Sequence, residues 1–292
     1  MINQKTGERS FEVNSELTLS ELFDLIVRNK LTVLISVSFF SIASLVYAFS
    51  LEDVYKSEAI LASVPEDRSS NSQLYDLSEF AGFNLGSSKL NKSDQALEIL
   101  KSLDFFEAFA TKYDVLVPLM AATGWNKEKN ELVFTKNFEK KIYSTQEAHK
   151  VFLNKLNISP DSKGIIKISL EHFSPFVAQN WLERLIFEIN STIKEEDKYK
   201  AEQSISFLRE EISKTDFIGI KSALNNLIEK QIETVMLANT TPDYVFTTLS
   251  KPFSPEKKYL PNRLLILSMG FIFGFSISFL YIFLRFHLVK FK

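Results

Sequence analysis

The side chains most often used for metal binding and proton transfer are few and scattered in this chain. The three histidines, His149, His172 and His287, are far apart, and none belongs to a spacing such as HExxH. There is no cysteine, which excludes disulfides, thiol nucleophiles and cysteine-based metal sites. The phosphate-binding patterns GxxxxGK[ST] and GxGxxG are missing, as is the GxSxG nucleophile elbow. The sequence therefore predicts a protein that is not an enzyme, with no catalytic residue, cofactor or metal site.

Charged residues are abundant but mixed in sign. The chain has 34 Lys and Arg against 36 Asp and Glu, a net charge of −2. A balance of this kind gives no basic surface for nucleic acid, so we expect no nucleic-acid partner. The acidic clusters Glu195-Glu196-Asp197 and Glu210-Glu211 are typical of the solvated face of a long helix, with contacts between subunits as the alternative.

One spacing indicates close helix packing. Gly270 and Gly274 lie four residues apart in the apolar segment GFIFG. Two glycines at this distance remove side chains from one stripe of a helix and let another backbone approach. We expect the partner to be the other apolar run of the chain or the same run of a neighbouring subunit. The alternative is a chance pattern, since GxxxG is frequent in apolar sequences.

Two apolar runs near the ends of the chain dominate its organisation. They are residues 31–51 (LTVLISVSFFSIASLVYAFSL) and residues 264–284 (LLILSMGFIFGFSISFLYIFL), and neither contains a charged residue or a histidine. About 20 helical residues, at 1.5 Å rise each, cross the ~30 Å hydrocarbon core of a bilayer. A helix packed in a soluble core is usually shorter and has a polar face. The runs therefore predict transmembrane helices at residues 31–51 and 264–284.

Two spans place residues 1–30 and 285–292 on one side of the membrane and residues 52–263 on the other. The short terminal segments carry Arg28, Lys30, Arg285, Lys290 and Lys292, which favours a cytoplasmic location for both. The first run could instead be a cleaved signal peptide with Val46-Tyr47-Ala48 as its small-residue site. The length of the run and the acidic residues before it, Glu16, Glu21 and Asp24, argue against cleavage.

The region between the spans has the pattern of an α+β domain. Ile166, Ile168 and Leu170 alternate with polar residues and predict a strand at 165–171, with further strands at 55–64 and 245–249. An apolar stripe over 96–110, opened by Ser93, predicts one helix, and residues 146–156 predict another. Loops are expected around Pro118, Gly124 and Asn126. Short helices are also expected at 74–80 and after the capping box at residues 18–21.

A helical hairpin is expected to project from this base. Beyond Pro175 there is no Pro or Gly up to Lys214, enough for one helix of roughly 60 Å. Its apolar stripe is broad up to Ile193, as for a core-facing helix, and then becomes a narrow seam typical of a single partner helix. The seam consists of Ala201, Ile205, Leu208 and Ile212. A return helix over about 220–238 should pack on it, with residues 215–219 as the tip. This assigns about 52–194 and 239–263 to the base and about 195–238 to the hairpin.

The order of these features resembles the polysaccharide co-polymerases of the Wzz type, the chain length determinants of bacterial surface polysaccharides. The resemblance extends from Leu17 to Leu284. It includes the segments Leu22-Phe23-Asp24-Leu25, residues 55–63 (YKSEAILAS), the helical region 96–114 followed by Trp125, and residues 163–181 with Ser174-Pro175. The most diagnostic part is the membrane-proximal end, with Pro252, Pro255 and Pro261 in Lys251-Pro252, Ser254-Pro255-Glu256-Lys257 and Pro261-Asn262-Arg263.

The resemblance implies a homo-oligomer of the bacterial inner membrane whose main domain is periplasmic. Members of this family set how many repeat units a Wzy-type polymerase adds to an undecaprenyl-diphosphate-linked polysaccharide. Because only residues 285–292 follow the second span, the chain resembles the O-antigen class without a kinase domain. Two alternatives stay open: the same fold acting on enterobacterial common antigen, capsule or a separate kinase, and a periplasmic adaptor of an export pump. Because the hairpin of one chain should cover the seam only partly, we expect neighbouring subunits to pack beside it.

Overall fold

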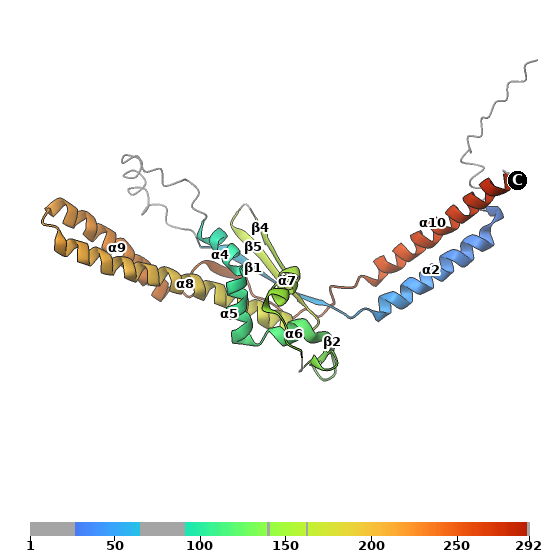
Figure 1. Ribbon diagram of the computed structural model, residues 1–292, viewed down its shortest axis with the longest axis horizontal. Helices are drawn as coiled ribbons and strands as arrows, with labels where there is room; N and C mark the ends of the chain where they lie inside the picture. Colours follow the sequence, from blue (N-terminus) through green and yellow to red (C-terminus); the bar gives the residue numbers. More distant parts are fainter. Residues whose placement is uncertain (1–26, 65–90, 139–140, 162, 291–292) are drawn as a thin grey trace, which may run out of the picture. The chain divides into compact units, whose positions relative to one another are not determined.

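The computed structural model describes residues 27–64, 91–138, 141–161 and 163–290. The helices expected after residue 18 and at 74–80 lie outside these ranges. The chain divides into two units, one formed by Met1–Leu51 together with Pro261–Lys292 and the other by Glu52–Leu260. Figure 1 shows the elements in sequence colours.

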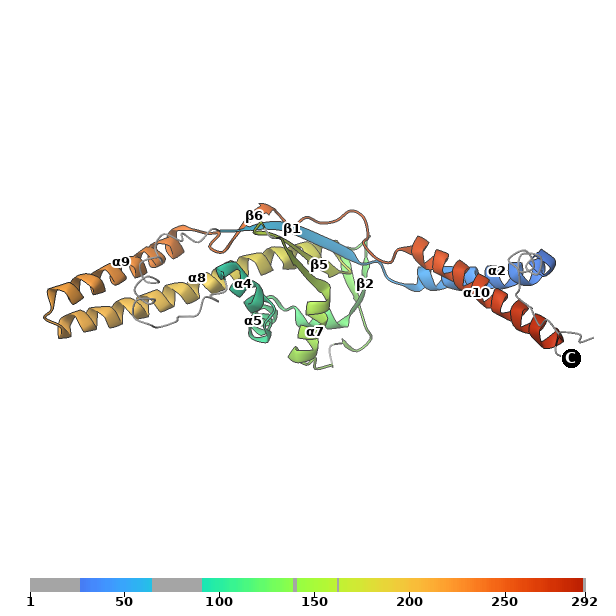
Figure 2. The same cartoon turned by 90° about the horizontal axis from the view of Figure 1, so that it is seen from above.

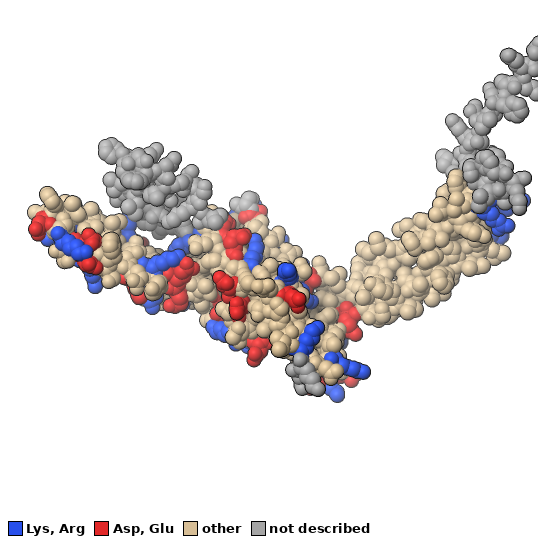
Figure 3. Space-filling view, viewed as in Figure 1, with Lys and Arg blue, Asp and Glu red and all other residues tan. Residues whose placement is uncertain are grey.

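The first unit is a pair of long apolar helices. Helix α2 covers Lys30–Ser50 and helix α10 covers Arg263–Lys290. The two pack along each other (Figure 1, blue and red). By length and composition, Lys30–Ser50 and Arg263–Arg285 are both able to cross a membrane. Their outer surface in Figure 3 is almost free of charged side chains, and residues such as Leu34, Phe39 and Ile272 are mostly exposed.

The second unit contains a four-stranded antiparallel sheet. Its strands are β1 (Tyr55–Ser63), β4 (Leu156–Pro160), β5 (Ile165–His172) and β6 (Phe246–Ser250), in the order β4-β5-β1-β6. The register of the central pair places Ala59 opposite Ile168. Alternate residues of β1 are buried, as the period of two predicts. In β5, Ile166, Ile168 and Leu170 are buried as expected, and Ser169 is buried as well. The strands expected at 55–64, 165–171 and 245–249 are thus confirmed, and each of their boundaries agrees to within one residue.

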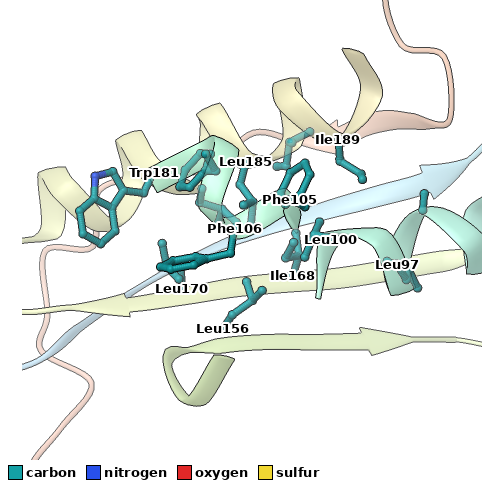
Figure 4. Packing of buried hydrophobic residues seen from close by; sticks show 14 of the residues in the cluster. Leu97, Leu100, Phe105, Phe106, Leu156, Ile168, Leu170, Trp181, Leu185 and Ile189 are labelled. Carbon is teal, nitrogen blue, oxygen red and sulfur yellow. The ribbon is translucent and has the colours of Figure 1, made fainter. Parts of the chain in front are cut away.

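Helices cover one face of this sheet and form the core with it. They are α4 (Lys92–Leu100), α5 (Leu103–Tyr113), α6 (Leu116–Ala121), α7 (Thr145–Lys155) and the first half of α8 (Pro175–Lys214). Figure 4 shows Phe105, Phe106, Leu170, Trp181 and Leu185 meeting between α5, α8 and the sheet. Helices gathered on one face of an antiparallel sheet make an α+β domain, the predicted fold class.

The expectation of one helix over residues 96–110 was wrong. The chain forms two helices, α4 and α5, with a break at Lys101 and Ser102. Ser102 is the N-cap of α5, and its hydroxyl accepts a hydrogen bond from the backbone N–H of Phe105 at 3.2 Å. Ser93, expected to open the helix, lies inside α4, which begins after Asn91.

A small β-hairpin replaces the loops expected around Gly124 and Asn126. Strands β2 (Ala122–Asn126) and β3 (Glu131–Phe134) pair with each other in a separate two-stranded sheet. The turn includes Asn130 at a positive φ of 53°, a conformation that asparagine tolerates better than most residues. The side chain of Asn126 accepts hydrogen bonds from the backbone N–H groups of Glu128 and Lys129 and so closes the turn.

The expected helical hairpin is confirmed. Helix α8 runs without interruption over Pro175–Lys214, and α9 covers Ile218–Thr240. Ser174 caps α8 by accepting from the N–H of Val177, and Pro175 stands in the first turn, where its missing N–H costs nothing. The link, residues 215–217, is shorter than the predicted tip because α9 begins at Ile218. Figure 2 shows the two arms side by side beyond the base.

Candidate functional site

The described residues contain no group of three His, Asp or Glu side chains that could hold a metal ion. The two histidines with described side chains instead form backbone contacts. Nε2 of His149 lies 2.9 Å from the carbonyl oxygen of Lys101, at the break between α4 and α5. His172, the last residue of β5, is almost fully buried.

His172 holds together three parts of the base. Its Nδ1 accepts a hydrogen bond from the N–H of Ser174 at 3.1 Å, while Nε2 lies 3.3 Å from the carbonyl oxygen of Pro118 in α6. Its ring meets Trp181 of α8 edge to face at 4.9 Å between centroids. Burial lowers the pKa of His172 from 6.5 to about 4, so the ring is neutral at pH 7. Since both nitrogens are occupied, this residue positions structure and is not placed for catalysis.

The glycines singled out in the second apolar run face the first one. A Cβ built on Gly274 would lie 2.9 Å from Cα of Val37, and one on Gly270 would overlap the side chain of Ser44. The hydroxyl of Ser36 donates to the carbonyl oxygen of Gly274 at 2.9 Å. Helices α2 and α10 therefore approach most closely along the stripe that lacks side chains, as small-residue packing in membranes requires.

An apolar groove of about 640 Å³ runs beside this contact. It is lined from α2 by Phe40 and Tyr47 and from α10 by Met269 and Phe273, among others. Phe40 and Phe273 meet edge to face at 5.3 Å in its wall. Its lining is almost wholly apolar, which suits a lipid chain or another apolar helix and offers no chemistry.

The seam of the helical hairpin is covered only in part within one chain. Ala201 is buried, whereas Ile205, Leu208 and Ile212 are half-buried. The return helix α9 is also covered only in part within one chain. Ile228 is buried, but Ile232 is 40% and Met236 60% exposed.

Further large apolar side chains of the hairpin are open to solvent. Tyr199 and Phe207 of α8 are 65% and 61% exposed, and Ile218 at the tip is 86% exposed. Ile232 and Met236 of α9 are exposed as well, so both arms of the hairpin carry large apolar side chains open to solvent, beside charged residues (Figure 3). An apolar surface of this kind indicates an interaction site.

Two polar clusters lie where the hairpin leaves and returns to the base, and sequence patterns did not reveal either of them. In the first, the Asn190 side chain accepts from the N–H groups of Val245 and Phe246 and donates to the carbonyl oxygens of Ile186 and Phe246. All the hydrogen-bonding capacity of this buried amide is thereby used. The available signal was a polar residue at a position of the apolar stripe, between Ile189 and Ile193.

The second cluster consists of Lys92, Asp197 and Tyr244. Lys92 Nζ is 2.8 Å and the Tyr244 hydroxyl 3.0 Å from Asp197 Oδ2. Burial acts to lower the pKa of Lys92, but the hydrogen bond and charge of Asp197 outweigh it and raise this pKa. Burial also raises the pKa of Tyr244. The cluster fixes α4, α8 and the start of the return strand at one point where the hairpin leaves the base.

The proline-rich segment lies along the base and precedes the second apolar helix in the sequence. Pro252 is buried, and its carbonyl oxygen accepts from the Gln179 side chain at 3.3 Å. The carbonyl oxygen of Phe253 accepts from the Ser57 hydroxyl at 2.8 Å. Pro255 and Pro261 are half-buried, and between them Leu260 pairs with Val54. The segment therefore follows β1 back to the point where the chain entered the domain.

Residues 15–113 match the family model described as Wzz, chain length determinant protein. This match confirms the resemblance inferred from the sequence and supports a Wzz-type family over the first third of the chain. Comparison with curated protein sequences gives no match.

This chain is also similar to three solved structures, each at low sequence identity. A full-length bacterial polysaccharide co-polymerase is 14% identical, with a TM-score of 0.41, covering 94% of this chain and 99% of the other. A fragment of WzzB, the polysaccharide co-polymerase from Salmonella Typhimurium, is 15% identical, with a TM-score of 0.32, covering 72% and 100%. A mutant of the Shigella flexneri lipopolysaccharide O-antigen chain-length regulator is 13% identical, with a TM-score of 0.22, covering 70% and 100%.

Proposed function

We propose that this chain, whose residues 15–113 match the Wzz chain length determinants, regulates the length of a bacterial surface polysaccharide. The family match is the observation on which the proposal rests. The two apolar helices fit a protein of the inner membrane, with the domain between them in the periplasm. In this arrangement residues 1–30 and 285–292 face the cytoplasm and residues 52–263 the periplasm.

The protein acts as a scaffold and not as a catalyst in this proposal. Its polysaccharide is lipopolysaccharide O-antigen, carried on undecaprenyl diphosphate and extended by a Wzy-type polymerase, which performs the chemistry. The features that support a scaffold are surfaces without reactive groups. They are the close helix pair at Gly270 and Gly274, the hairpin seam, and the exposed apolar side chains of the hairpin, such as Phe207 and Met236.

The scaffold is a homo-oligomer in this proposal. The hairpin arms leave Ile205, Leu208 and Ile212 half-buried and Phe207 exposed, so one chain does not cover its own apolar surface. Neighbouring hairpins packed side by side would remove this surface from water, at roughly 25 cal/mol for each Å² buried. The groove beside α2 and α10 offers an equivalent surface for a partner within the membrane.

Deletion of the gene, followed by electrophoresis of lipopolysaccharide, tests the function. The proposal expects glycan chains that are still made but have lost their preferred length, with recovery when the intact gene is returned. An unchanged length distribution would contradict a role in O-antigen length. Complete loss of polymer would also contradict it, because the polymerase and not this protein is proposed to form the glycosidic bonds.

A further inference from the structure

An aromatic cluster lies at the end of the Glu52–Leu260 unit where the chain enters and leaves it. Tyr55, the first residue of β1, meets Trp125 of β2 edge to face at 5.6 Å between centroids. Trp125 in turn meets Phe176 in the first turn of α8 at 6.0 Å. Directly before Tyr55, Val54 pairs with Leu260, the last residue of the unit.

Chain connectivity keeps this end close to the bilayer in any orientation of the domain. Val54 follows Ser50, the end of the first candidate span, by four residues, and Leu260 precedes Arg263, the start of the second, by three. An extended chain covers at most about 3.5 Å per residue, so these links reach no more than about 14 Å and 11 Å. The polar headgroup layer on each side of the hydrocarbon core is itself several Å thick. The cluster therefore lies at or next to the headgroups.

The surface around the cluster is apolar and aromatic. Phe176 is 50% exposed, Tyr259 48%, Val133 48% and Leu260 42%, while Trp125 is half-buried. The Tyr55 hydroxyl is buried and finds no hydrogen-bond partner among the described residues. Tryptophan and tyrosine are the residues enriched at the level of lipid headgroups, where an apolar ring and a polar edge are both accommodated.

Lysine side chains lie over the same rings. Nζ of Lys127, in the β2–β3 turn, is 5.7 Å from the ring centroid of Tyr55. Nζ of Lys56 is 4.8 Å from that of Tyr259 and also pairs with Glu58 at 2.8 Å. Long lysine side chains can lie along apolar surface while their ammonium groups reach toward lipid phosphates. Aromatic rings with Lys127 beside them are thus suited to a phospholipid surface.

From these observations we infer that the β2–β3 hairpin, with Trp125 and Phe176, inserts into the headgroup region of the bilayer. If the domain were held only at the two points where the spans leave the membrane, it could tilt about the line that joins them. Trp125 and the hairpin supply a third contact beside that line, and three contacts fix the tilt of the domain on the membrane. The lipid surface would thereby hold the helical hairpin at a constant angle. This inference requires the two spans but does not depend on which polysaccharide is regulated.

The chain has two tryptophans, which makes the contact measurable. Trp125 is the probe, and Trp181, 5% exposed in the core, is the internal control. The full-length Trp181→Phe and Trp125→Phe variants are reconstituted in phosphatidylcholine–phosphatidylglycerol vesicles. Each is measured with and without lipids brominated in the upper acyl chain. Because an indole at headgroup depth meets these bromines, Trp125 emission should fall about twofold, while Trp181 emission stays nearly constant.

Two results would overturn the inference. Quenching of Trp125 by aqueous acrylamide but not by brominated lipid would place it in water. Quenching by neither would mean that protein, such as a neighbouring subunit, covers it. If Trp181→Phe does not fold, the comparison of the unaltered chain with Trp125→Phe gives the Trp125 contribution by difference. Loss of glycan length control in a separate assay would not affect this result, so the proposed function and the lipid contact fail independently.

Discussion

The side chain of Asn190 on α8 bonds both backbone groups of Phe246 at the start of β6. Its Oδ1 accepts from the N–H of Phe246 at 2.9 Å, and its Nδ2 donates to the carbonyl oxygen of the same residue at 3.1 Å. A single amide thus takes the place of a strand neighbour for the first residue of the edge strand. It ties the chain that returns from the hairpin to the helix that leaves for it.

Asn190→Ala should destabilise the domain strongly. The change leaves the buried N–H groups of Val245 and Phe246 without an acceptor, at about 1–3 kcal/mol each. We expect the Tm of the purified protein to fall on the order of 10 °C. Asn225→Ala, at an exposed position of α9, is the matched control and should change the stability by less than about 0.5 kcal/mol. Equal Tm values for the two variants would mean that the Asn190 amide does not stabilise the contact between α8 and β6.

The buried His172 predicts a pH dependence of stability. Its pKa is about 4 in the folded chain against 6.5 as the ordinary value, so between these values the unfolded chain binds the proton and the folded chain does not. The stabilisation is complete above pH 6.5 and is lost as the pH falls toward 4. The shift corresponds to about 3 kcal/mol.

The His172→Gln variant isolates this contribution. At pH 7 it should be less stable than the unaltered protein, because glutamine packs less well against Trp181. Its deficit in the free energy of unfolding should shrink by about 3 kcal/mol as the pH falls to 4. Asn190→Ala, which removes no titrating group, provides the comparison. A deficit that stays constant with pH in His172→Gln would refute the assignment.

Local patterns were sufficient for the long elements. The alternation of Ile166, Ile168 and Leu170 gave β5, and the absence of Pro and Gly after Pro175 gave α8 in full. The break between α4 and α5 was missed because Leu100, Leu103 and Phe106 keep helical spacing across it. Only the single cap residue Ser102 marks the end of one helix and the start of the next.

Elements that depend on distant partners were not predicted. Strand β4 has five residues and follows α7 directly, so its pairing with β5 decides its conformation. The same holds for the polar junctions. Nothing near Asn190 or Asp197 in the sequence identifies Phe246 or Lys92 as a partner, since these contacts arise only when the return strand reaches the sheet. The packing of the two glycines could be expected from the sequence, because glycines four residues apart in an apolar run indicate close helix packing even when the partner is unknown.

Gly274→Leu should weaken the contact between α2 and α10. The added side chain meets the backbone at Val37, which cannot move aside as a flexible side chain would, and it displaces the Ser36 hydrogen bond. We expect lower thermal stability in detergent and a broader glycan length distribution, with membrane insertion retained. Ser268→Leu adds a similar volume at an exposed position of α10 and serves as control. If both variants behave like the unaltered protein, the glycine stripe has no role in packing.

Reporter fusions test the proposed topology. A reporter enzyme active only in the periplasm is fused after Asn239, at the end of the hairpin, or after Lys292. The two candidate spans predict activity at Asn239 and none at Lys292. Activity at Lys292 would contradict the topology, because it would mean that the second apolar run does not carry the chain back across the membrane.

Two adjacent residues of α8 test two different roles of the hairpin. One role is the contact between its own two arms, and the other is the contact between neighbouring subunits. Leu208 belongs to the half-buried seam, whereas Phe207 is 61% exposed. Leu208→Asp places a carboxylate in the seam, where a buried unpaired charge costs several kcal/mol or opens the hairpin locally. It should therefore lower both thermal stability and glycan length control. Asn226→Asp adds the same charge at an exposed position of α9 and should change neither.

Phe207→Asp should weaken assembly without destabilising the single chain. Because its side chain is exposed in the single chain, the change should alter stability by no more than about 0.5 kcal/mol. If neighbouring hairpins cover Phe207, the variant should dissociate into smaller species in light-scattering measurements and yield short or unregulated glycans while polymerisation continues. A Phe207→Asp protein with unchanged assembly and glycan length would exclude the surface around Phe207 as the subunit contact. An unaltered protein that is a monomer in both detergent and lipid would rule out the scaffold itself.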